Sequence, residues 1–177
     1  MYAKIAGKDQ PHQLLWVNQQ VVKDLSWLAH HFAAGSGIFM LDAIAWNARD
    51  ADLILFTNTS SIALGIWASH LNIGLSFPLP SVRNSDSIFF FETYVVCCAI
   101  HYASTLQPPI HCLAIYSDNL NTVEIFNMMK AHNKYNILLQ FVIDLLIQHD
   151  INLQVYRIPG ECNTIADALS RHLFDQL

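Results

Sequence analysis

The sequence predicts an α/β fold in which a mixed five-stranded sheet is flanked by helices. Two short runs, Leu53–Phe56 and Cys112–Tyr116, are apolar at consecutive positions, which is typical of central strands covered on both faces. The segment Ser85–Leu106 between them is apolar on every side and predicts a buried helix. Because this helix connects the two runs, we expect the two strands to be parallel neighbours.

The remaining segments extend the sheet on both sides. Ile62–Ala68 and Ile73–Phe77 predict strands that complete an antiparallel three-strand meander with the first run. Asn152–Arg157 alternates between apolar and polar residues, as a half-exposed strand does. Apolar spacing and capping residues predict three further helices, which are residues 119–132 with Asn119 as the cap, residues 135–149, and a last helix that starts at Asn163.

A helical lead-in precedes the sheet. Pro11 opens a pattern of apolar residues at three-to-four spacing that ends at Gly35, which predicts an amphipathic helix. A short apolar run, Ile38–Leu41, is expected to be extended. We therefore predict two parts, a helical lead-in over residues 1–50 and an α/β domain over residues 51–177.

The amino-acid composition limits the kinds of partner that the chain is expected to bind. The 177 residues are 53% hydrophobic with a mean hydropathy of +0.30, which predicts an apolar surface that another protein segment covers. Uninterrupted apolar runs of about 18 residues and a signal-peptide pattern are both lacking, so we expect an intracellular protein without a membrane partner. Nine Lys and Arg residues and a formal charge of −5 argue against strong unaided binding to a polyanion.

Four polar residues are expected to converge at one edge of the sheet. Asn58 and Asp118 follow the two central strands, Glu92 lies on the crossover helix, and Asp167 lies on the last helix. Carboxylates that converge without a basic neighbour favour a hard divalent cation such as Mg²⁺. Two such ions could clamp the attacking water and the leaving oxygen of a phosphodiester.

Each of these residues also has a simpler interpretation. Glu92 could be solvated at a helix edge, Asp118 could cap a helix, and Asp167 could be a solvated helix residue. Asn58 could be a turn residue without a ligand role. Thr57, Ser60 and Ser61 could touch a sugar-phosphate backbone, although hydroxyl groups are common in turns.

Four segments resemble the signature blocks of the RNase H-like domain that follows the reverse transcriptase of retroelements. They are Phe56–Ser60, Phe91–Thr93, Tyr116–Asn119 and, most specifically, Arg157–Arg171, with the sequence RIPGECNTIADALSR. The last block is most similar to fungal and DIRS-type elements. The blocks together cover residues 51–171, and the segment around Val21–Trp27 is similar to the tail of the preceding polymerase.

The resemblance implies a fold, a reaction and partners. Members of this family cut the RNA strand of an RNA–DNA hybrid with two Mg²⁺ ions, or Mn²⁺, held by an Asp, Glu, Asp, Asp set. Glu92, Asp118 and Asp167 match the last three members and are the implied metal ligands. Asn119 and Asn163 are implied substrate contacts, with Asn163 also expected to cap the last helix. The reverse transcriptase portion of the same polyprotein is the implied protein partner.

The chain departs from the family at the first member of the set, where Asn58 stands in place of Asp. An amide offers one neutral carbonyl oxygen, so weak metal binding and a large loss of rate are expected. A degenerate copy, an engineered inactivation and a variant that tolerates the amide remain open. The alternative function is a catalytically inactive domain that keeps the fold and binds another protein. An exonuclease or integrase relative is disfavoured by the order of the acids and by the last block.

Overall fold

The computed structural model of the chain describes residues 17–34, 46–80 and 88–176. The chain divides into two compact units, Met1–Leu41 and Asp42–Leu177. In the first unit, helix α2 spans Gln19–Ala34. Asn18 precedes this helix, and its side-chain oxygen accepts a hydrogen bond of 3.0 Å from the backbone N–H of Gln20, so the helix begins later than the expected start at Pro11. Pro11 itself and the run Ile38–Leu41 lie outside the described residues.

The second unit contains the predicted mixed five-stranded sheet. Its strands are β1 (Leu53–Thr59), β2 (Ala63–Ala68), β3 (Ile73–Pro78), β4 (Cys112–Ser117) and β5 (Asn152–Arg157), in the spatial order β3-β2-β1-β4-β5. The first three form the antiparallel meander, and β4 and β5 add to β1 in parallel. The sequence-based prediction of this sheet is therefore confirmed.

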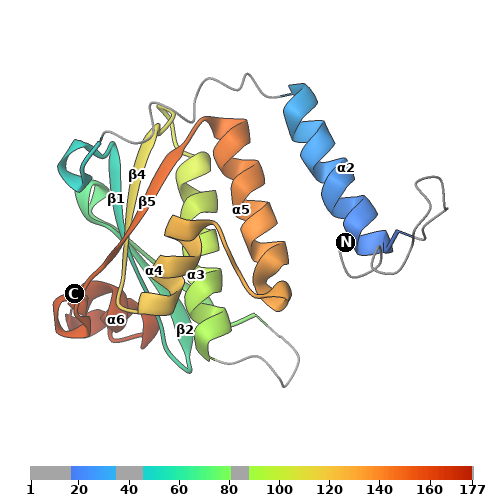
Figure 1. The fold of residues 1–177 in the computed structure, drawn as a ribbon. Coiled ribbons are helices and arrows are strands. Elements are labelled where there is room, and N and C mark those ends of the chain that lie inside the picture. The colour runs from blue at the N-terminus through green and yellow to red at the C-terminus, as the bar shows by residue number, and fades with distance from the viewer. Residues whose placement is uncertain (1–16, 35–45, 81–87, 177) are drawn as a thin grey trace, which may run out of the picture. The chain divides into compact units, whose positions relative to one another are not determined.

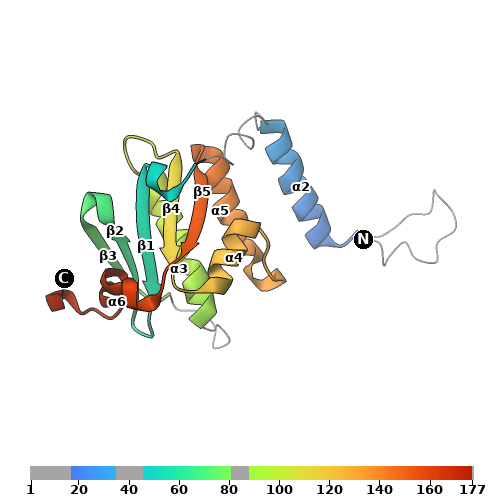
Figure 2. The ribbon, with the colours of Figure 1, turned by 60° about the vertical axis from the view of Figure 1, so that its left-hand side comes forward.

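Within the described part of the second unit, four α-helices flank the sheet, and Figure 2 shows α6 on the face opposite the other three. Helix α3 spans Ile88–Ser104, α4 spans Leu120–Met128, α5 spans Asn136–His149 and α6 spans Thr164–Ser170. Helix α4 ends four residues before the predicted end at His132. The residue that follows it, Met129, adopts a left-handed conformation with φ of 48°, which stops the helix.

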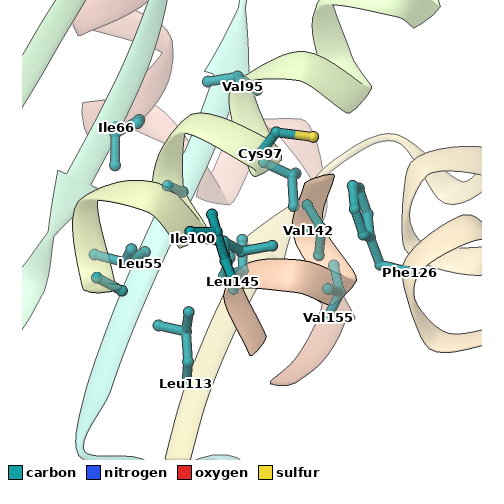
Figure 3. Packing of buried hydrophobic residues seen from close by; sticks show 14 of the residues in the cluster. Leu55, Ile66, Val95, Cys97, Ile100, Leu113, Phe126, Val142, Leu145 and Val155 are labelled. Atoms are coloured by element: carbon teal, nitrogen blue, oxygen red, sulfur yellow. The ribbon is translucent and has the colours of Figure 1, made fainter. Parts of the chain in front are cut away.

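The hydrophobic core lies between the sheet and the layer of α3, α4 and α5 (Figure 1). Side chains from β1, β2, β4, β5, α3, α4 and α5 meet in it. Figure 3 shows several of them, among them Leu55, Leu113, Ile100, Val142 and Phe126. This core therefore accounts for part of the high hydrophobic content of the sequence. None of the described helices is both long enough and apolar enough to cross a bilayer. The four cysteines, Cys97, Cys98, Cys112 and Cys162, are free.

The connector ahead of β1 belongs to the second unit, which spans Asp42–Leu177. A 3₁₀ helix spans Ala48–Asp50 ahead of β1. The carbonyl oxygen of Trp46 accepts a hydrogen bond of 3.0 Å from the side chain of Gln154 on β5. This long-range bond ties the connector to the sheet, and apolar spacing along the sequence could not reveal it.

Candidate active site

The structure brings the four predicted residues to the edge where β1 and β4 end. Thr57 pairs with Ser117 at the last register position of these parallel strands, so Asn58 and Asp118 follow side by side. Glu92 comes from α3 on one face of the sheet, and Asp167 comes from α6 on the other. The site therefore spans the sheet edge, with contributions from both layers.

Asn58 and Asp167 are joined directly. The side-chain nitrogen of Asn58 donates a hydrogen bond of 2.7 Å to Oδ1 of Asp167. Asn58 is buried, with 5% of its surface exposed. The amide therefore acts as a donor to the neighbouring carboxylate and does more than fill a turn position.

Arg171 provides a second partner for Asp167. Its Nε donates to Oδ1 at 2.8 Å and to Oδ2 at 2.9 Å, one helical turn away on the same face of the helix end. Arg171 belongs to the last signature block but was not among the predicted site residues. The i,i+4 spacing of an acid and a base on a predicted helix was the signal that could have identified this pair.

Glu92 is buried, so the interpretation of it as a solvated residue at a helix edge is wrong. Only 6% of the residue is exposed, and its Oε2 has no hydrogen-bond partner among the described residues. Burial, together with the nearby charge of Asp118, raises the pKa of Glu92 to about 8. At neutral pH this side chain is therefore mainly the uncharged acid.

Asp118 interacts electrostatically with both of the other acids. Burial raises its pKa above the ordinary value, and the charge of Asp167 adds to this effect, while a hydrogen bond from its own backbone opposes it. A Cβ atom placed on Gly160 would lie 3.4 Å from Oδ2 of Asp118, so the loop before α6 packs against this carboxylate. Asp118 is therefore within electrostatic reach of Glu92 and of Asp167.

The two asparagines predicted as substrate contacts have structural partners. Asn119 caps α4, since its side-chain oxygen accepts a hydrogen bond of 3.2 Å from the N–H of Thr122, as expected. Asn163 is at the N-cap position of α6, as expected, but its side chain makes no capping hydrogen bond. Its amide nitrogen instead donates to the carbonyl oxygen of Thr57 at 2.9 Å, which links α6 to β1.

The hydroxyl residues predicted to touch substrate differ in exposure. Thr57 is fully buried, and its hydroxyl donates to the carbonyl oxygen of Tyr116 on β4. Ser60 is also buried and donates to the carbonyl oxygen of Ser170 at the end of α6. Ser61 is exposed in the turn after β1. A direct contact with a sugar-phosphate backbone thus stays a prediction, and of the three residues the exposed Ser61 is the best placed to make it.

Helix α6 approaches the sheet more closely than the apolar pattern of the sequence predicts. A Cβ atom on Gly65 of β2 would lie 2.3 Å from the carbonyl oxygen of Ala166, so the helix backbone lies directly against the strand. The hydroxyl of Ser76 on β3 donates to the carbonyl oxygen of Leu169 at 3.0 Å. Glycine in a strand is a known signal of close backbone approach, and Gly65 could have been interpreted in this way.

The side chains at this edge do not fit a two-cation site of the kind that the resemblance implies. Within the described parts of the chain, no three His, Cys, Asp or Glu side chains form a group that could hold a metal ion. Asn58 supplies a neutral amide whose nitrogen faces Asp167, and Arg171 contacts both oxygens of the same carboxylate.

Comparison with solved structures identifies the fold. RNase H1 from the halophilic archaeon Halobacterium salinarum NRC-1 matches with a TM-score of 0.55 and 14% identity, over 71% of this chain and 98% of that protein. LC11-RNase H1, solved in complex with an RNA/DNA hybrid, matches with a TM-score of 0.54 and 14% identity over the same shares. The chain has the ribonuclease H fold. At this level of identity the likeness establishes the ribonuclease H fold alone.

A region of similar fold also occurs within a viral protease-reverse transcriptase. Prototype foamy virus protease-reverse transcriptase matches with a TM-score of 0.50 and 13% identity, over 72% of this chain but only 21% of the viral chain. The likeness is thus confined to one part of that protein. No family model matches the sequence, and no curated protein does.

Proposed function

We propose that this chain is the ribonuclease H-like domain of a retroelement, that it binds RNA–DNA hybrids, and that it cleaves their RNA strand slowly or not at all. The observation that carries the proposal is the position of Asn58, Glu92, Asp118 and Asp167 around the adjoining ends of two parallel strands. In open α/β sheets this edge is the usual position of a functional site.

Impaired cleavage follows from the chemistry of the first residue of the set. An Asp at position 58 would carry two anionic oxygens, whereas Asn58 carries one neutral oxygen and donates its N–H to Asp167. A hybrid-cleavage assay with Mg²⁺ or Mn²⁺ tests this point. We expect little or no product from the present chain and partial recovery in Asn58→Asp, with Asp118→Asn in the same background as the inactive control. Full cleavage by the present chain would contradict the proposal.

Hybrid binding is a separate claim with its own measurement. Fluorescence anisotropy in EDTA, with a labelled RNA–DNA hybrid and a duplex DNA of the same sequence, reports binding without cleavage. Since the whole sequence has only nine Lys and Arg residues, we expect weak binding that needs low salt. Equal affinity for both duplexes would remove the hybrid as the preferred ligand.

The natural setting of the domain is part of the same proposal. We infer that it works inside the cell beside the reverse transcriptase portion of a longer polyprotein. Contacts of the polymerase portion with the hybrid would compensate for the few basic residues of this domain. The foamy virus protein, in which the matched region is a small part of a protease-reverse transcriptase, supports such a setting. Increased hybrid affinity on addition of the polymerase portion is the expected result.

A second candidate is an inactive domain that binds another protein through an apolar surface. Large apolar side chains are exposed on α5, namely Ile137 at 71%, Phe141 at 44% and Ile147 at 49%. Such residues on one helix favour a protein contact. Sedimentation velocity over a range of concentrations tests this candidate, with Phe141→Ser as the variant. A strictly monomeric chain that no partner stabilises would count against it.

A further inference from the structure

Both oxygens of the Asp167 carboxylate are already engaged by the protein's own side chains. Oδ1 accepts hydrogen bonds from Asn58 at 2.7 Å and from Arg171 at 2.8 Å, and Oδ2 accepts from Arg171 at 2.9 Å. The contacts with Arg171 are charge-assisted, and such hydrogen bonds are stronger than those between neutral groups. Asp167 thus has a positive partner without any added ion.

The backbone holds Arg171 in position for this role. Arg171 is the C-cap of α6, and its N–H donates to the carbonyl oxygen of Asp167 at 3.1 Å. The hydroxyl of Ser170 donates to the same carbonyl oxygen at 2.8 Å. Helix α6 is in turn fixed to the sheet through Ser60 and Ser76. The backbone of Arg171 is therefore held one helical turn beyond the Asp167 carboxylate.

A divalent cation would compete with these partners. The three hydrogen bonds take up three of the roughly four lone-pair positions of the carboxylate, whereas Mg²⁺ needs an oxygen lone pair at about 2.0–2.1 Å. A cation at this point would also face the positive charge of Arg171 and would gain no anionic oxygen from position 58. Each of the two side chains thus lowers the affinity for a cation by a different physical route.

We propose that Arg171 is the resident counter-cation of this acid cluster and that, together with the Asn58 amide, it keeps Asp167 from serving as a metal ligand. The inference goes beyond the proposed function, because it concerns the charge balance of the side chains and holds whether or not the domain binds hybrids. It also predicts that Asn58→Asp alone restores only part of the cation affinity, since Arg171 remains in place.

Manganese binding to the full chain without nucleic acid tests the proposal. Electron paramagnetic resonance of free Mn²⁺ gives the dissociation constant for the present chain, Asn58→Asp, and Asn58→Asp combined with Arg171→Gln. We expect the weakest binding in the present chain and roughly tenfold tighter binding in the double variant than in Asn58→Asp, the size expected for removal of one nearby positive charge. Arg49→Gln, on the exposed 3₁₀ helix before β1, is the matched control in the Asn58→Asp background.

An equal dissociation constant in Asn58→Asp with and without Arg171 would overturn the proposal. A readout on the unmodified chain remains decisive if the double variant does not fold. In a nuclear magnetic resonance titration with Mn²⁺, the Nε–H signals of Arg171 and Arg49 should broaden equally. Selective broadening of Arg171 at low Mn²⁺ would show a cation beside Asp167 and would also overturn the proposal. Hybrid anisotropy in EDTA is independent of both results, so a failure here is distinguishable from a failure of hybrid binding.

Discussion

The side-chain nitrogen of Asn58 donates a hydrogen bond of 2.7 Å to Oδ1 of Asp167, although 109 positions separate the two residues. This bond joins the end of the central strand to the short terminal helix. With Asp at position 58, two neighbouring carboxylates would repel each other. The amide of Asn58 instead makes an attractive contact with Asp167. Stability and cation affinity are therefore expected to change in opposite directions when position 58 becomes an acid.

Asn58→Asp should destabilise the cation-free domain. The substitution removes a donor and places a second carboxylate beside Asp167, so we expect a loss of about 1–3 kcal/mol in the free energy of unfolding in EDTA. Urea denaturation followed by circular dichroism measures it. The matched control is Asn72→Asp, at an exposed position with φ of 53°, which should change stability little. A neutral or stabilising effect of Asn58→Asp in EDTA would contradict the contact.

Glu92 should make stability depend on pH. Its folded pKa of about 8 exceeds the ordinary value of 4.5 because of burial first and Asp118 second. The folded protein therefore binds more protons than the unfolded chain between these values, and stability should fall as pH rises from about 4.5 to about 8. Glu92→Gln should remove this slope and stabilise the domain above pH 8 by up to about 5 kcal/mol.

Thermal denaturation from pH 5 to pH 9 provides the measurement for Glu92. Glu124→Gln, on the exposed face of α4, is the matched control and should leave the slope unchanged. A profile of Glu92→Gln that runs parallel to that of the present chain would show that Glu92 ionises normally in the folded state.

Gly65→Ala should disturb the docking of α6. The added Cβ would lie 2.3 Å from the carbonyl oxygen of Ala166 and 2.7 Å from the backbone nitrogen of Ser170, and neither backbone atom can move without moving the helix. We expect a loss of about 1–3 kcal/mol or more. At Gly74 the nearest atom is 2.9 Å away on the flexible Leu169 side chain, so Gly74→Ala should cost less. A larger loss of unfolding free energy in Gly74→Ala than in Gly65→Ala would contradict this packing.

Asn163→Ala should loosen α6 from β1. It removes the donor to the Thr57 carbonyl oxygen and leaves that buried acceptor without this partner, which costs about 1–3 kcal/mol. Asn119→Ala removes a helix cap and should cost about 1 kcal/mol. Hydrogen exchange separates the two, since faster exchange should appear in α6 for Asn163→Ala and in α4 for Asn119→Ala. Protection of α6 that is unchanged in Asn163→Ala would count against the link.

Local patterns in the sequence determined the architecture. Consecutive apolar residues in Leu53–Phe56 and Cys112–Tyr116 identified the central strands, and the order of strands and helix required them to be parallel. The same reasoning placed Asn58 and Asp118 at one edge, because parallel strands end together. The sequence also singled out Glu92 as the acidic residue within a hydrophobic helix, and this residue is buried in the structure.

Only the tertiary structure decided which atoms face one another at that edge. The side chain of Asn163 points to the Thr57 carbonyl oxygen instead of capping its helix, and Asp167 is held by Asn58 and Arg171. These choices depend on the backbone approach of α6 to the sheet at Gly65. The period of apolar residues reports which face of an element is buried, but it carries no information on hydrogen-bond geometry between elements about a hundred residues apart.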